Sequence, residues 1–139
     1  MNNILAYSIL ITVILIADVI WLTLQKPRYN SLVTAVQGSQ IKVKYAPALF
    51  TYILVIISII FIAIPLVRMQ LSKTNKSAIN IFKTSLVYGG MVGLCIYGIF
   101  NFTNMSIFKD YKLSMAIMDT TWGVVLYTMS CFLFFHFSK

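Results

Sequence analysis

The chain alternates long apolar stretches with short polar segments that are mostly basic. Four stretches are apolar over about 20 residues or more: 4–24, 47–67, 79–100 and 113–137. A helix needs roughly 20 such residues to cross the hydrocarbon core of a bilayer. Because a backbone exposed to lipid must satisfy its own hydrogen bonds, each stretch is predicted to be a helix. The pattern therefore predicts an all-α, integral membrane four-helix bundle, formed by a single transmembrane domain over residues 1–139.

The first connection, residues 25–46, is the longest and carries a helical signal of its own. Pro27 suits the first turn of a helix. Four apolar or aromatic residues then follow helical spacing on one face: Tyr29, Leu32, Val33 and Val36. We predict a short amphipathic helix at the membrane interface that ends near Gly38. The alternative is that the first span continues into a tilted tail.

Composition supports a membrane protein and changes the meaning of the charge. The chain is 60% hydrophobic and only 10% charged, whereas a soluble domain has about 25% charged residues. Its net charge of +8 would suit a nucleic-acid-binding protein. However, most Lys and Arg residues lie between the apolar stretches, where positive charge sets topology and meets anionic lipid headgroups. The expected partners are the lipid bilayer and these headgroups, with no nucleic acid. The basic flank after the first span favours both termini outside the cytoplasm.

Two of the three acidic residues, Asp18 and Asp119, are predicted to lie within hydrocarbon. A charged side chain is costly there unless it is paired or faces the protein interior. Asp18 lies about six residues before the end of the first span, and Asp119 about six residues after the start of the fourth. In an antiparallel bundle both then lie roughly 9 Å below the same interface. We predict one polar layer that contains both carboxylates and four neighbours: Asn101, Asn104, Thr120 and Trp122.

Both aspartates belong to the same local pattern, Asp-x-x-Trp, in which residues i and i+3 share a helix face. Trp21 is predicted to lie one turn nearer the interface than Asp18 and to act as an interfacial anchor. Trp122 is predicted to lie one turn deeper than Asp119, too deep for such an anchor. We expect Trp122 to pack inside the bundle as a wall of a pocket.

The predicted layer indicates proton or cation handling by a transporter-, channel- or sensor-like protein. Two nearby carboxylates in a low dielectric share a proton or bind a cation, and no basic residue is predicted at their depth. The main alternative is a structural membrane or envelope component whose aspartates only pin helices together. Small multidrug exporters also have four spans and an acidic residue in the first helix, but they use glutamate, which this chain lacks.

Small residues in the third and fourth predicted spans favour close helix packing. Four positions carry this signal, including a GxxxG pair: Ser85, Gly89, Gly93 and Gly123. Packing within one bundle is the favoured interpretation, and a homodimer seam is the alternative. We expect that a chain this small needs to dimerise before it encloses a path. No zinc motif, nucleophile triad, P-loop or dinucleotide fingerprint is present. We therefore expect no enzymatic activity, metal site or cofactor.

Three blocks of sequence, DVIWL at 18–22, YGIFNFTN at 97–104 and AIMDTTWG at 116–123, resemble in order the conserved blocks of a known family. That family comprises short four-helix predicted membrane proteins and is catalogued as domain of unknown function 2177. The resemblance implies the four-helix architecture and the location of the polar site, but no activity. It also implies relatives in bacteria and some large DNA viruses, many with aspartate at the position of Asn101. This chain would then have one potential charge fewer in its polar layer.

Overall fold

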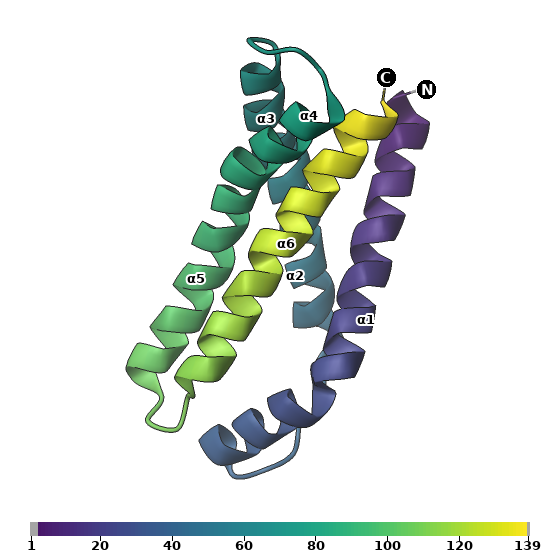
Figure 1. The fold of residues 1–139 in the computed structure, drawn as a ribbon. Helices are drawn as coiled ribbons and strands as arrows, with labels where there is room; N and C mark the ends of the chain where they lie inside the picture. The colour runs from purple at the N-terminus through teal and green to yellow at the C-terminus, as the bar shows by residue number, and fades with distance from the viewer. Residues whose placement is uncertain (1–2, 139) are drawn as a thin grey trace.

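The computed structural model describes residues 3–138, with side chains from Leu5 onward. This part of the chain is helical, and its elements follow in the order α1 (Asn3–Gln37), α2 (Tyr45–Ser58), η1 (Ile59–Ala63), α3 (Ile64–Leu71), α4 (Ala78–Thr84), η2 (Ser85–Gly89), α5 (Gly90–Ile107) and α6 (Leu113–Phe137). The two η elements are single π-helical turns inside longer helices. The chain thus forms four long antiparallel helical segments, with the start of α1 beside the end of α6 (Figure 1).

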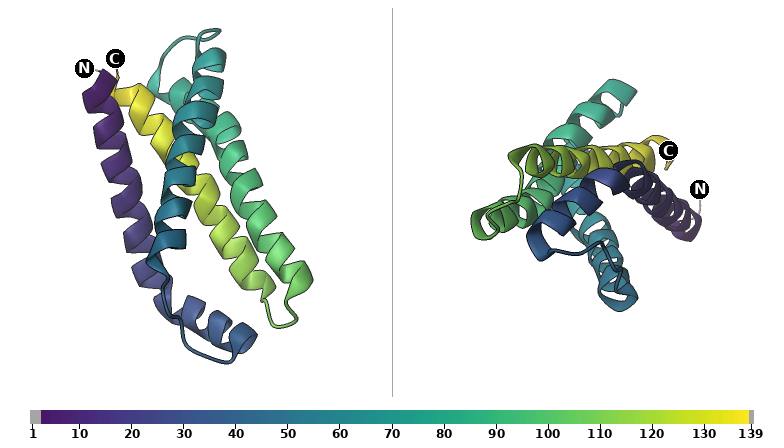
Figure 2. Two further views of the ribbon diagram at one scale, coloured as in Figure 1. Left: turned by 180° about the vertical axis from the view of Figure 1, so that it is seen from behind. Right: turned by 90° about the horizontal axis from the view of Figure 1, so that it is seen from below.

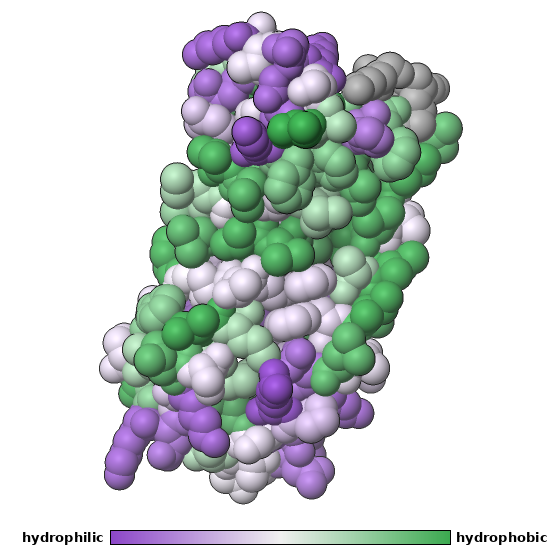
Figure 3. Space-filling view, viewed as in Figure 1, coloured by the Kyte–Doolittle hydropathy of each residue, from purple (hydrophilic) through white to green (hydrophobic). Residues whose placement is uncertain are grey.

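The predicted all-α bundle is confirmed. Four segments are long and apolar enough to cross a membrane: Leu5–Gln37, Tyr45–Leu71, Ala78–Ile107 and Leu113–Phe137. An apolar belt lies between polar ends on the face shown in Figure 3. Since large apolar side chains such as Phe61 and Ile99 are mostly exposed, this surface suits lipid better than water.

The second segment continues through Pro65, although proline usually breaks a helix. Proline has no N–H to donate, and its ring clashes with the carbonyl four residues earlier. The π-turn η1 immediately precedes α3, in which Pro65 lies in the first turn. Because a π-turn widens the backbone locally, it provides room for the ring and keeps the segment helical to Leu71.

The predicted interfacial helix is wrong as a separate element, but the predicted end is right. The first helix is continuous from Asn3 to Gln37, with Pro27 inside it. Gly38 then ends the helix with φ +74°, a left-handed conformation that glycine adopts without strain. Figures 1 and 2 show that the last part of α1 bends and runs across the end of the bundle. A proline inside a helix is the usual cause of such a bend.

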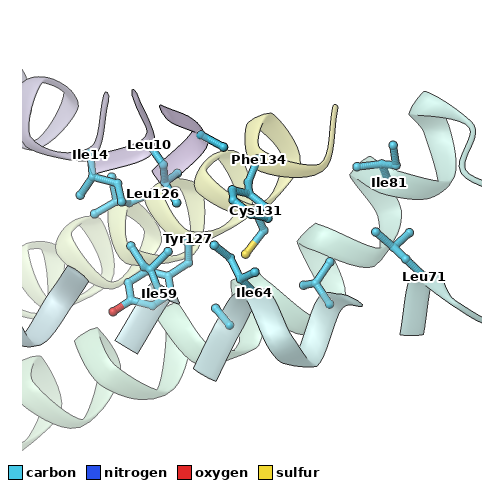
Figure 4. Packing of buried hydrophobic residues seen from close by; sticks show 13 residues of the cluster. Leu10, Ile14, Ile59, Ile64, Leu71, Ile81, Leu126, Tyr127, Cys131 and Phe134 are labelled. Atoms are coloured by element: carbon cyan, nitrogen blue, oxygen red, sulfur yellow. The ribbon is translucent and has the colours of Figure 1, made fainter. Parts of the chain in front are cut away.

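The fourth segment, α6, is the centre of the bundle. In its most apolar stretch of 18 residues, 50% of the residues are buried, against 17–28% in the corresponding stretches of the other three segments. Figure 4 shows Leu126, Tyr127 and Cys131 of α6 packed among apolar side chains of the other segments. Leu10 and Ile14 of α1 belong to the same cluster. This apolar core fills the half of the bundle near the start of α1, and Asp18 and Asp119 lie in the other half.

Candidate binding cavity and its polar layer

Asp119 is the centre of a hydrogen-bond network that joins α1, α5 and α6. Its side chain is only 8% exposed. The Asn101 amide donates to Asp119 Oδ2 at 2.7 Å, and the Tyr29 hydroxyl donates to Asp119 Oδ1. Both carboxylate oxygens therefore have a donor, which offsets the cost of burying this group.

Asn101 extends this network to the connection between α5 and α6. Its side chain is fully buried, and its amide nitrogen also donates to the Tyr97 carbonyl at 2.9 Å. The Tyr111 hydroxyl donates to Asn101 Oδ1 at 2.6 Å. Burial first, and then the Asp119 charge, raise the pKa of Tyr111 above its usual value of 10.0. Tyr111 therefore keeps its proton and remains a donor at neutral pH.

Asp18 of the first Asp-x-x-Trp pattern is held differently, by the tryptophan of the second pattern. The Trp122 indole nitrogen donates to Asp18 Oδ1 at 2.9 Å. Trp21, one turn beyond Asp18 on α1, stacks on Trp122 with ring centroids 4.6 Å apart and an interplanar angle of 3°. Both side chains of the first pattern thus contact the tryptophan of the second. This pairing of the two patterns across α1 and α6 is not predictable from the spacing of the residues alone.

Both carboxylates line one cavity of about 600 Å³. Its walls come from α1, α2, α5, α6 and the α1–α2 connection, and they comprise Asp18, Trp21, Leu22, Tyr29, Val43, Tyr45, Ala48, Thr51, Tyr52, Val55, Ile96, Tyr97, Phe100 and Asp119. No Lys, Arg or His belongs to this lining within the described part of the chain. The cavity is therefore apolar and aromatic, with two acidic groups and no basic one.

The predicted site residues separate into pairs rather than one continuous layer. Asp119 bonds to Asn101, and Asp18 bonds to Trp122. Between residues 5 and 138, no hydrogen bond joins the two carboxylates directly, so the structure provides no direct contact for a proton shared between them. They share the cavity instead.

Asn104 and Thr120 stand apart from this network. Neither residue lines the cavity. Thr120 is buried, and its hydroxyl has no hydrogen-bond partner among the described residues. Asn104 is only partly buried, and no side-chain hydrogen bond joins it to the described chain. The prediction placed both residues in the layer from their depth alone, but depth does not fix the direction of a side chain.

Two tyrosines of the network were not among the predicted site residues. Tyr29 lies on the apolar face of the predicted interfacial helix, and its helical spacing was the only available signal. Tyr111 lies in the short connection after α5, where the sequence carries no pattern that indicates a buried donor. Both reach Asp119, directly or through Asn101, because the chain bends near Pro27 and turns back after Phe108.

The predicted small residues lie in the contact between α5, η2 and α6 within one chain. We call Gly89, Gly90, Gly93 and Gly123 the glycine seam. A β-carbon at Gly93 would fall on the Gly123 carbonyl oxygen, and one at Gly123 would fall on the Tyr97 ring. One at Gly89 would lie 3.0 Å from Cys131 Sγ. Ser85 is also fully buried. Only glycine permits this approach of the two helices.

No group of three His, Cys, Asp or Glu side chains that could hold a metal ion occurs in the described residues. Neither a curated protein nor a solved structure matches the chain significantly. A family model described as "Predicted membrane protein (DUF2177)" matches residues 3–135, which include the first three helical segments, α6 as far as residue 135, and the residues that line the cavity. The chain belongs to this family of predicted membrane proteins.

Proposed function

We propose that this protein is a multi-pass membrane protein that takes up a proton or a cation at Asp18 and Asp119, as a transporter, channel or sensor. One observation carries the proposal: two carboxylates line a single cavity that has no basic side chain in its described lining. An acidic group in a low dielectric is stabilised by a proton or a nearby positive charge. The space beside the two carboxylates is therefore suited to an incoming proton or cation.

The two carboxylates are unequal in this proposal. Asp119 has a donor on each oxygen, from Tyr29 and Asn101. Asp18 accepts a hydrogen bond from Trp122, and the Tyr52 hydroxyl also lies near its carboxylate, whereas a carboxylate offers about four lone-pair sites. Asp18 therefore has more capacity left for a ligand. We assign Asp18 as the group that exchanges its proton or cation and Asp119 as the fixed partner.

Infrared spectroscopy of the carboxyl groups tests this assignment. The purified protein in bilayers is titrated with acid and then with Na⁺ or K⁺, and each Asp→Asn variant assigns one band. We expect a band that disappears in Asp18→Asn and shifts when cation is added. Asp110→Asn is the matched control, because Asp110 is the third acidic residue and is exposed outside the cavity. Two carboxyl bands that respond to neither protons nor cations would show the proposal to be wrong.

A structural role is the second candidate, and the hydrogen bonds of the network favour it. Asp119 connects α1 to α5 and α6, and Asp18 connects α1 to α6. If these aspartates only hold helices together, Asp119→Asn lowers the free energy of unfolding, and the carboxyl infrared bands of the wild-type protein do not shift when cation is added. If Asp18 binds a cation, Asp18→Asn removes the cation response and leaves stability nearly unchanged. Asparagine retains an oxygen that accepts from Trp122.

Multi-pass insertion is part of the proposal and has its own test. The apolar belt between two polar ends supports it (Figure 3). Basic residues at these ends would meet anionic headgroups. We assign no catalytic step to this protein. Ser39→Cys and Lys73→Cys, each in a chain without Cys95 and Cys131, place one thiol in each of two connections at opposite ends. A membrane-impermeant thiol reagent should label them from opposite sides of a vesicle, and labelling from the same side would exclude an odd number of crossings between them.

A further inference from the structure

The cavity is larger than a proton or an inorganic cation requires. Its volume of about 600 Å³ falls within the range of roughly 300–1,000 Å³ typical of sites for drug-sized ligands. A proton on Asp18 fills none of this space, and a bare metal ion fills a small part of it. Most of the lining is side-chain carbon and aromatic ring, which contributes nothing to the binding of a small hydrated ion.

Burial differs strongly among the residues that line the cavity, and we call the most exposed part, around Val43 and Tyr45, its mouth. Asp119 lies at the buried end and is 8% exposed, whereas Val43 and Tyr45 at the mouth are 60% and 84% exposed. Phe100 is a second exposed aromatic residue of the lining, at 61%. The charge is therefore deep, and the surface nearest the outside is apolar. A complementary ligand has a positive head and an apolar tail.

Aromatic side chains surround the space between these two ends. Trp21, Tyr29, Tyr52 and Tyr97 all belong to the lining. The faces of such rings attract an ammonium group within about 6 Å, and most strongly when that group is quaternary and weakly hydrated. No Lys or Arg belongs to the described lining of the cavity, so no cationic side chain of that lining competes for these rings or for Asp18.

We propose that the cavity binds an amphiphilic organic cation, a protonated or quaternary ammonium compound with an alkyl tail. The head lies among the aromatic rings near Asp18 and Asp119, and the tail extends towards Val43 and Phe100 at the mouth. This inference rests on the proposed function, since it assigns a substrate class to that cation site. An amphiphile concentrates at the membrane interface, and the mouth adjoins the basic connection between α1 and α2, where such an interface would lie.

Tryptophan emission in nanodiscs provides the test, with octyltrimethylammonium as the probe. Both tryptophans of the chain, Trp21 and Trp122, lie at the site, so their emission reports occupancy without a label. We expect a saturable change in emission with octyltrimethylammonium. Octanol, which has the tail without the charge, and tetramethylammonium, which has the charge without the tail, should each bind at least about 10-fold more weakly.

Substitutions then locate the binding. Asp18→Asn should weaken octyltrimethylammonium binding about 10-fold or more, because it removes a charge and keeps the acceptor of the Trp122 hydrogen bond. Asp110→Asn, its control outside the cavity, should leave binding unchanged. Tyr52→Leu should weaken binding about 3- to 30-fold, because it removes a ring face and the hydroxyl that lies near Asp18. Phe61→Leu, an exposed aromatic residue that does not line the cavity, is the matched control.

The outcomes separate this inference from the proposed function. Binding that is equal for octanol, or insensitive to Asp18→Asn, would mean partition of the tail into an apolar slot and would overturn the inference. Carboxyl infrared bands that respond to protons or Na⁺, together with no saturable octyltrimethylammonium binding, would overturn the inference and leave the proposed function intact. Inert carboxyl bands and no binding would overturn both.

Discussion

The glycine seam between α6 and the segment formed by η2 and α5 and the cavity between α1, α2, α5 and α6 are built from similarly apolar sequences, yet one is closed and the other is open. At the seam, the Gly93 and Gly123 backbones touch, and no room remains for a single methyl group. At the cavity, about 600 Å³ stays unfilled next to two carboxylates. The two regions lie on neighbouring sides of the same helices.

Side-chain size at the helix contact explains the difference. The seam has glycine on both helices, so that dispersion contacts and backbone approach hold α5 against α6. By contrast, α2 contains no glycine, and the large side chains of Trp21, Tyr52 and Tyr97 line the cavity. In lipid there is no hydrophobic gain from closing such a gap. The close contact at the seam thus lies beside an open cavity.

The largest predicted effect comes from filling the seam. In Gly93→Val, the new side chain meets the Gly123 carbonyl, which belongs to the backbone and cannot rotate away. We expect a loss of at least about 3 kcal/mol in the free energy of unfolding, or no folded protein. Unfolding in mixed micelles measures it. Gly98→Ala is the control, because its β-carbon would lie 3.7 Å from Thr120, an ordinary contact. Equal stability of the two variants would disprove the backbone clash.

The next effect comes from the buried amide beside the cavity. Asn101→Leu leaves Asp119 Oδ2 and the Tyr111 hydroxyl without a protein partner. Each unsatisfied buried group costs about 1–3 kcal/mol, so we expect a total loss of about 3 kcal/mol in unfolding free energy. Asn104→Leu is matched in chemistry and helix, but no described hydrogen bond is lost. It should change stability by less than about 0.5 kcal/mol. Similar losses in both variants would mean that general polarity, and not the network, matters.

A smaller effect should loosen the cavity while the seam stays intact. Tyr29→Phe removes one hydrogen bond to Asp119 and keeps the ring. We expect a loss of about 1–2 kcal/mol and faster hydrogen exchange confined to the last part of α1. Tyr45→Phe at the mouth, where the side chain is 84% exposed, should change neither quantity. Faster exchange in α5 as well would show that the two regions are not independent.

The smallest effect concerns Tyr111 and appears only at high pH. Its pKa is raised in the folded protein, first by burial and then by Asp119. The folded state therefore holds this proton more tightly than the unfolded chain does. The resulting stability is fully present below pH 10 and is lost as the pH rises through the folded pKa. Tyr111→Phe should make the unfolding free energy less sensitive to pH above 10. An unchanged slope in that variant would assign the pH dependence to other tyrosines.

The sequence alone was sufficient to predict the architecture. Four apolar stretches fix four helices, since an apolar segment of this length has no other way to satisfy its backbone in lipid. The blocks around Asp18, Asn101 and Asp119 indicated the family, and the family model confirms it over residues 3–135. The glycines also pointed to a close contact, because a missing side chain is visible in the sequence itself.

Only the tertiary structure decided what each polar group contacts. The rise per residue gives Asp18 and Asp119 a similar depth. The rotation of each helix about its axis then decides the partners: Asp18 bonds to Trp122, and Asp119 bonds to Asn101 and Tyr29. The bend of α1 brings Tyr29 to the site, and the turn after α5 brings Tyr111 there. No local sequence pattern predicts either the bend or the turn. Whether a segment forms a spanning helix depends on its own run of apolar residues and on the lipid around it. The cavity and its network depend on side-chain contacts between residues 90 and 104 apart in the chain, together with contacts 18 and 10 residues apart, and a pattern within one helix does not predict them.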